Sequence, residues 1–108
     1  MNDEQTTERV MFDFRKTQGE LLVDAYYRAA VETAHAAGLG VESEAGGPGP
    51  PIHRVPVDAL LAQGAVDSVR GEFWPYRMEN SAIWVVKETA CAAHIYGKKL
   101  VHMEAFTS

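Results

Sequence analysis

Three short strand-like runs, each with a glutamate near its end, alternate with helical segments along this chain. They read LGVESE (residues 39–44), AVDSVRGEFW (65–74) and KLVHMEAF (99–106). Strands that are joined through helices pair in parallel with right-handed crossovers. A closed (β/α)8 barrel needs about 250 residues, whereas an open three-stranded sheet leaves both edges bare. The pattern therefore predicts an α/β fold in the form of a partial (β/α)8 barrel, with about three parallel strands and intervening helices.

Capping residues and glycines indicate where the helices begin and end. Thr17 and Glu20 have the spacing of a capping box, which predicts a helix start near Thr17. Residues 1–11 precede this start and are expected to form a disordered or linking segment. Gly38 and Gly97 follow helical patterns and are expected to end them. The expected helices cover residues 17–38, 57–64 and 82–96.

Charge and composition exclude several classes of partner. The formal net charge is −5 and the basic runs RKT and GKK are short, so no patch can follow a nucleic-acid backbone. No run approaches the roughly 20 apolar residues that a membrane span needs. The N-terminus lacks the pattern of a secretory signal, which predicts a cytoplasmic chain if taken literally and leaves the localisation of a longer parent unknown. Cys91 is the only cysteine, and its alanine-rich surroundings predict a small buried thiol.

The glutamates of the three runs, Glu44, Glu72 and Glu104, are the candidate catalytic residues. Converging carboxylates suit glycoside hydrolysis, in which one group protonates the leaving oxygen and another activates water or attacks the sugar. Trp74 and Tyr76 closely follow Glu72, and their aromatic faces are candidate substrate-binding surfaces. The alternative is that the glutamates are ordinary solvated residues and that Trp74 belongs to the core.

A histidine shares the last strand with the third glutamate. His102 and Glu104 are two residues apart, so they lie on the same face of a strand, and we assign His102 to substrate binding as well. Together with Glu44 or Glu72 this pair could hold a cation. Oxygen ligands favour calcium, since a zinc spacing such as HExxH is absent. The alternative is a plain hydrogen bond between His102 and Glu104. The metal candidates are therefore Glu44, Glu72 and Glu104.

Several segments resemble one family of enzymes. DFRKTQGELLVDAYY (13–27), AHAAGLGVESEAGG (34–47), RGEFW (70–74) and KETACAAHIYGKKLVHMEAFTS (87–108) are similar to the catalytic barrel of α-L-rhamnosidase-like glycoside hydrolases, which form glycoside hydrolase family 106 and its relatives. The resemblance runs from about Phe12 to Ser108, and the order of GEFW and AAHIYGKK…EAFTS is its most specific part.

The resemblance implies a large multidomain enzyme that removes terminal rhamnose from polysaccharides or glycosides by an inverting, calcium-assisted reaction. It matches Glu44, Glu72 and Glu104 to the strand-end glutamates of the family, without deciding which is the acid and which the base. Residues 1–108 are then expected to be a fragment of the catalytic domain that is inactive alone. Its expected partners are a carbohydrate substrate and either the missing parts of the parent or a second copy.

A different class of function accounts for the same residues without catalysis. The chain could be a small carbohydrate-binding or oligomerising α/β module that uses the same acidic and aromatic surface. A loop rich in glycine and proline, GGPGPPIHRVP (46–56), follows Glu44. We expect this loop to shape a substrate pocket, and the alternative is a surface excursion without a role.

Overall fold

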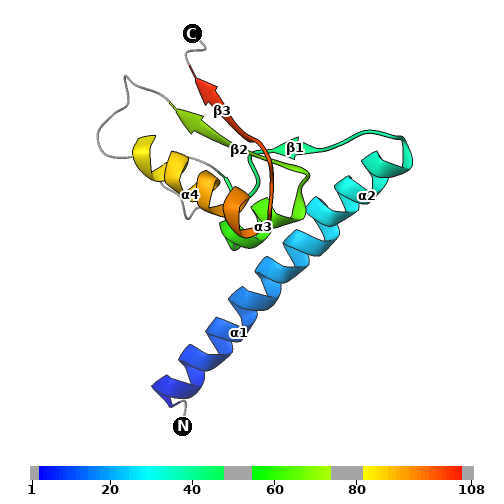
Figure 1. The fold of residues 1–108 in the computed structure, drawn as a ribbon. Coiled ribbons are helices and arrows are strands. Elements are labelled where there is room, and N and C mark those ends of the chain that lie inside the picture. Colours follow the sequence, from blue (N-terminus) through cyan, green and yellow to red (C-terminus); the bar gives the residue numbers. More distant parts are fainter. Residues whose placement is uncertain (1–2, 48–54, 74–81, 106–108) are drawn as a thin grey trace.

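The computed structural model describes residues 3–47, 55–73 and 82–105. A long helical rod precedes a small α/β unit (Figure 1). The rod consists of α1 (Glu4–Leu22), the π-helical segment η1 (Val23–Arg28) and α2 (Ala29–Ala36). The α/β unit consists of β1 (Glu42–Ser43), α3 (Ala59–Ala65), β2 (Ser68–Phe73), α4 (Ala82–Ile95) and β3 (Val101–Ala105).

The three described strands form one parallel sheet in the order β1-β2-β3. Glu42 pairs with Ser68 across the first ladder, and Glu72 pairs with Glu104 across the second. The predicted order of helices and strands and their parallel pairing are therefore confirmed. An open sheet of this kind is compatible with part of a barrel, and closure into a (β/α)8 barrel stays a prediction.

The rod begins earlier than predicted. Asp3 caps it by accepting a hydrogen bond from the backbone N–H of Gln5, so residues 4–11 are helical rather than disordered. The helix start that the capping-box pattern predicted at Thr17 was wrong, because Thr17 and Glu20 lie inside a helix that begins at Glu4. The helix ends where predicted, since Gly38 adopts a φ of 74° directly after the last helical turn.

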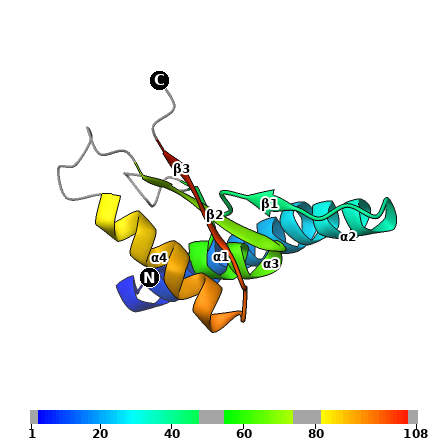
Figure 2. The ribbon, with the colours of Figure 1, turned by 45° about the horizontal axis from the view of Figure 1, so that its top comes forward.

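Helices α3 and α4 lie on one side of the sheet (Figure 2). The backbone of β2 comes close to α4, because a Cβ added to Gly71 would lie only 2.5 Å from the Thr89 hydroxyl oxygen. Val69 packs in the same layer with Ala92 and Ala93. Small residues thus permit the close helix–sheet packing that the alanine-rich run predicted. The buried thiol was a wrong prediction, since Cys91 is exposed on the outer side of α4.

A second core joins the rod to the sheet. Its buried members are Val23 from η1, Ala45 after β1, Ala62 from α3 and Val66 before β2. This core fixes the end of β1 between the rod and α3. Across the part of the chain that the structure describes, no helix is long and apolar enough to cross a membrane.

Candidate active site

The face of the sheet opposite α4 carries the charged residues. Val69 and Gly71 face α4, so Arg70 and Glu72 between and beyond them point to the other face, because strand side chains alternate. The ladder sets His102 beside Arg70 and Glu104 beside Glu72. The row of charged side chains on this face therefore follows from the parallel register of the strands and from the small residues that let α4 pack closely on the other face.

The three predicted glutamates come together at the carboxyl end of this sheet. One carboxylate oxygen from each of Glu44, Glu72 and Glu104 lies within 4.8 Å of the other two. All three side chains are half-buried. Glu44 directly follows β1, whereas Glu72 and Glu104 lie within β2 and β3. The structure thus brings all three together, while their catalytic roles stay predictions.

An arginine that sequence reasoning missed lies among these carboxylates. The guanidinium of Arg70 lies 3.5 Å from the Glu42 carboxylate, 3.7 Å from that of Glu44 and 3.8 Å from that of Glu104. Arg70 is two residues before Glu72 on the same strand, and this spacing was the available signal. Arg70 is thus shared by three carboxylates of the described residues.

His102 lies in the same group, with a partner other than the one expected. Its Nδ1 contacts Oε2 of Glu42, which is the first residue of β1. Glu104 was the partner expected from the sequence, and Glu42 carried no prediction. His102 therefore connects the two edge strands on the charged face, and its role in substrate binding stays a prediction.

Glu44 has the most perturbed environment of the group. Burial raises the pKa of its carboxyl group, and the neighbouring charges of Glu72 and Glu104 raise it further, against the opposing effect of Arg70. Its Oε1 is buried and has no hydrogen-bond partner among the described residues. A half-buried carboxyl group with a raised pKa and an unsatisfied oxygen is suited to proton transfer or to binding a cation.

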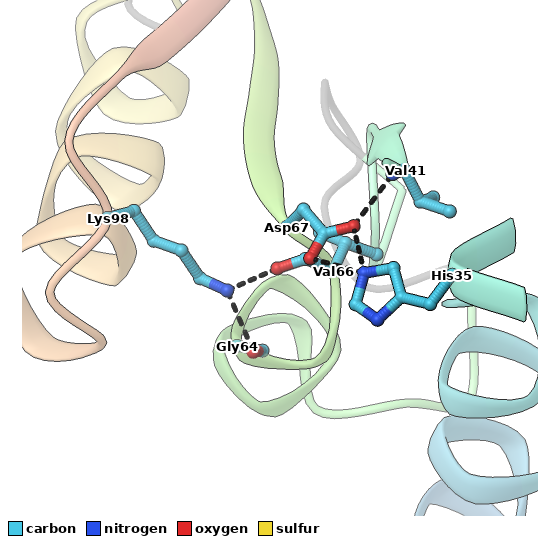
Figure 3. A network of polar contacts seen from close by, with 6 residues as sticks. All are labelled: His35, Val41, Gly64, Val66, Asp67 and Lys98. Carbon is cyan, nitrogen blue, oxygen red and sulfur yellow. Dashed lines mark hydrogen bonds and ion pairs between the residues drawn. The ribbon is translucent and has the colours of Figure 1, made fainter. Parts of the chain in front are cut away.

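The opposite end of the sheet carries a second polar network, which Figure 3 shows. Asp67, just before β2, accepts a hydrogen bond of 2.8 Å from the Val41 N–H and pairs with His35 at 2.9 Å. Lys98 donates to the carbonyl oxygens of Gly64 and Val66. The Val41 hydrogen bond lowers the pKa of Asp67, helped by His35 and Lys98 and opposed by partial burial. Sequence reasoning assigned no role to His35.

Other predicted site residues lie outside the described parts of the chain. They are Trp74, Tyr76 and residues 48–54 of the loop after Glu44. Their proposed roles in substrate binding and in shaping a pocket therefore stay predictions.

Carboxylates gathered at the carboxyl ends of parallel strands define a candidate hydrolase of the α/β class. The chain matches the glycoside hydrolase family 106 model, described as alpha-L-rhamnosidase, over residues 1–108, and it belongs to this family. It is also 30% identical over 105 residues to a Formosa agariphila protein named "Putative beta-glucuronidase". That match covers 95% of this chain but 8% of the relative. No solved structure gives a significant match.

Proposed function

We propose that this chain supplies carboxylate groups to the active site of a glycoside hydrolase that removes terminal α-L-rhamnosyl or related residues. The observation that carries the proposal is the meeting of Glu44, Glu72 and Glu104 within 4.8 Å at the carboxyl end of a parallel sheet. Membership of the rhamnosidase family supports the substrate class. The alternative, a non-catalytic sugar-binding module, predicts sugar binding without turnover.

The environments of the carboxyl groups suggest how the roles divide. A general acid must hold a proton near the working pH, and enzymes achieve this by burial and by neighbouring negative charge. Glu44 has both features, so we assign it as the proton donor to the leaving oxygen. Glu72 and Glu104 then supply the ionised carboxylates that activate water or bind a cation. The family resemblance implies an inverting reaction, whose acid and base lie about 6.5–9.5 Å apart. The three oxygens here meet within 4.8 Å, which favours cation binding over water activation for Glu72 and Glu104.

The same three residues fit calcium. Two oxygens that each lie 2.3–2.6 Å from Ca²⁺ are at most about 5 Å apart, and the three carboxylate oxygens meet this limit at 4.8 Å. The buried Oε1 of Glu44 accepts no hydrogen bond among the described residues and has only the 3.7 Å ion-pair contact with Arg70 Nε. Glu72 and Glu104, which remain ionised when Glu44 is the proton donor, would hold the ion, and Glu44 would join them only in its ionised form. Bound calcium would offset the negative charge of the group and orient sugar hydroxyls.

Replacing each glutamate by glutamine in the complete gene product tests the site. We expect Glu44→Gln, Glu72→Gln and Glu104→Gln each to lower turnover of a nitrophenyl α-L-rhamnoside by about 10²–10⁴-fold, because acid–base groups contribute this much. Glu32→Gln, on the exposed surface of α2, is the matched control. A parallel assay with a nitrophenyl β-glucuronide distinguishes the two sugar classes. Near-normal turnover of all three variants would show that the site is assigned wrongly.

Calcium binding has a test that does not depend on turnover. We expect calcium at 100 times its dissociation constant to stabilise the complete gene product by about 2.7 kcal/mol, measured as a rise in melting temperature. The variant with all three glutamates replaced by glutamine should lose this rise, while Glu32→Gln should keep it. An equal rise in the triple variant would place the cation elsewhere.

A further inference from the structure

The turn that follows β1, residues 45–47, is held in place by its neighbours, although it adjoins the charged face of the sheet. Ala45 is completely buried. Gly46 has a φ of 87°, and a Cβ there would lie 2.5 Å from Cα of Ala59. The N–H of Gly47 donates to the carbonyl oxygen of Glu44 at 3.2 Å. The backbone that carries Glu44 therefore has little freedom, because α3 is in contact with it.

A tyrosine from the rod completes this turn. The backbone N–H of Gly46 donates to the Tyr27 hydroxyl at 3.0 Å, in a partly buried position. Tyr27 also packs against the core around Val23 and Ala45. The ring of the neighbouring Tyr26 lies edge-on to the Tyr27 ring, with the two ring centroids 5.1 Å apart. Tyr26 is 66% exposed. The two tyrosines differ in whether the hydroxyl reaches the turn.

Tyr27 belongs to η1, the π-helical part of the rod. Single π-helical turns within α-helices are frequent at functional sites, because the wider turn changes the direction in which side chains point. Val23 and Tyr27 lie four residues apart within this segment, and both join the core beside the Glu44 turn. The irregular turn thus contains the residue whose hydroxyl binds the turn after β1.

We propose that Tyr27 is a positioning residue for Glu44, acting through the hydrogen bond between its hydroxyl and the Gly46 N–H. The phenol holds the turn that directly follows Glu44, and so sets how far the Glu44 carboxyl group extends toward Glu72 and Glu104. This inference rests on the proposed function only for its effect on turnover. The structural link between Tyr27 and the turn is independent of the reaction.

The test compares Tyr27→Phe with Tyr26→Phe in the complete gene product. Tyr27→Phe removes the hydroxyl and keeps the ring, so the core and the contact with Tyr26 remain. We expect faster amide hydrogen exchange, followed by mass spectrometry, in the peptide that spans residues 44–47. Peptides from β2 and β3 should exchange as in the wild type. Tyr26→Phe should leave all these rates unchanged.

Kinetics show whether the loosened turn matters for the reaction. We expect Tyr27→Phe to lower kcat by about 10- to 100-fold with little change in KM, since small displacements of a reacting group have effects of this size. Turnover is expressed per folded enzyme, taken from the melting curve, so that a general loss of stability does not mimic this fall in kcat.

The outcomes separate this inference from the proposed function. Unchanged exchange at residues 44–47 in Tyr27→Phe overturns the inference. So does faster exchange with unchanged kcat, if Glu44→Gln itself abolishes turnover. If Glu44→Gln is fully active while Tyr27→Phe speeds exchange only at the turn, the structural link is supported and the proposed role of Glu44 as proton donor fails.

Discussion

The two ends of the sheet carry charged groups in opposite states of balance. At the carboxyl end, Glu44, Glu72 and Glu104 approach one another with Arg70 as a shared counter-charge for Glu44 and Glu104. At the amino end, Asp67 has both a backbone donor and His35 as partners. Like charges held together destabilise a fold, whereas matched charges stabilise it. We therefore predict that the carboxyl end serves binding or chemistry and that the amino end serves stability.

The two ends of the sheet differ most if the carboxylate site at the carboxyl end works only together with strands beyond those described. Residues 1–108 expressed alone are expected to show no turnover of rhamnosides in calcium-containing buffer. They are also expected to self-associate, because Phe12 and Phe14 on α1 are 66% and 61% exposed and exposed apolar surface promotes association. Light scattering, a thermal melt and a nitrophenyl rhamnoside assay check this. A monomeric, sharply melting species that turns over substrate would contradict it.

A substitution at the amino end should separate stability from activity. We expect Asp67→Ala to lower the free energy of unfolding of the complete gene product by about 1 kcal/mol, since its contacts with the Val41 N–H and with the His35 ring are lost. The estimate is small because the Asp67 side chain is 37% exposed. Turnover should not change. Asp13→Ala, exposed on α1, is the control, and lost turnover at unchanged stability would show that the two ends are not separate.

These two ends were not equally predictable from the sequence. Strand alternation and parallel pairing are local rules, and they brought Glu72 and Glu104 to one face and to neighbouring positions. Gly38 and Gly97 ended their helices as expected, with φ values of 74° and 65°. The contact between His35 and Asp67 joins residues 32 positions apart, and no local pattern indicates it. Interactions of this kind depend on how the rod packs against the sheet.

Three other features were also missed from the sequence. The helix start at Glu4 was missed because the capping-box spacing at Thr17 looked like a boundary. The π-helical turn that holds Tyr27 has no signal in the apolar periodicity, and the hydrogen bond from the Gly46 N–H to the Tyr27 hydroxyl joins residues 19 positions apart. The exposure of Cys91 was missed because a run of small residues does not show which of them faces the sheet.

The smallest expected effect is a difference in pH dependence between the two ends. The folded-state pKa of Glu44 is raised, so its contribution to stability is fully present below its ordinary value of about 4.3 and is lost as pH rises through the folded value. The folded-state pKa of Asp67 is lowered, so its contribution is fully present above about 3.9 and is lost as pH falls through the folded value.

Glu44→Gln should therefore be more stable than the wild type at pH 7, and this advantage should vanish as the pH falls toward 4. The deficit of Asp67→Ala should instead persist from pH 7 to about 4 and decrease only below that value. Calcium-free denaturant titrations of the complete gene product at several pH values measure both differences, with Glu32→Gln as the reference for a plain surface carboxylate. Stability differences that follow the same pH course in both variants would mean that the ends of the sheet do not differ in charge balance.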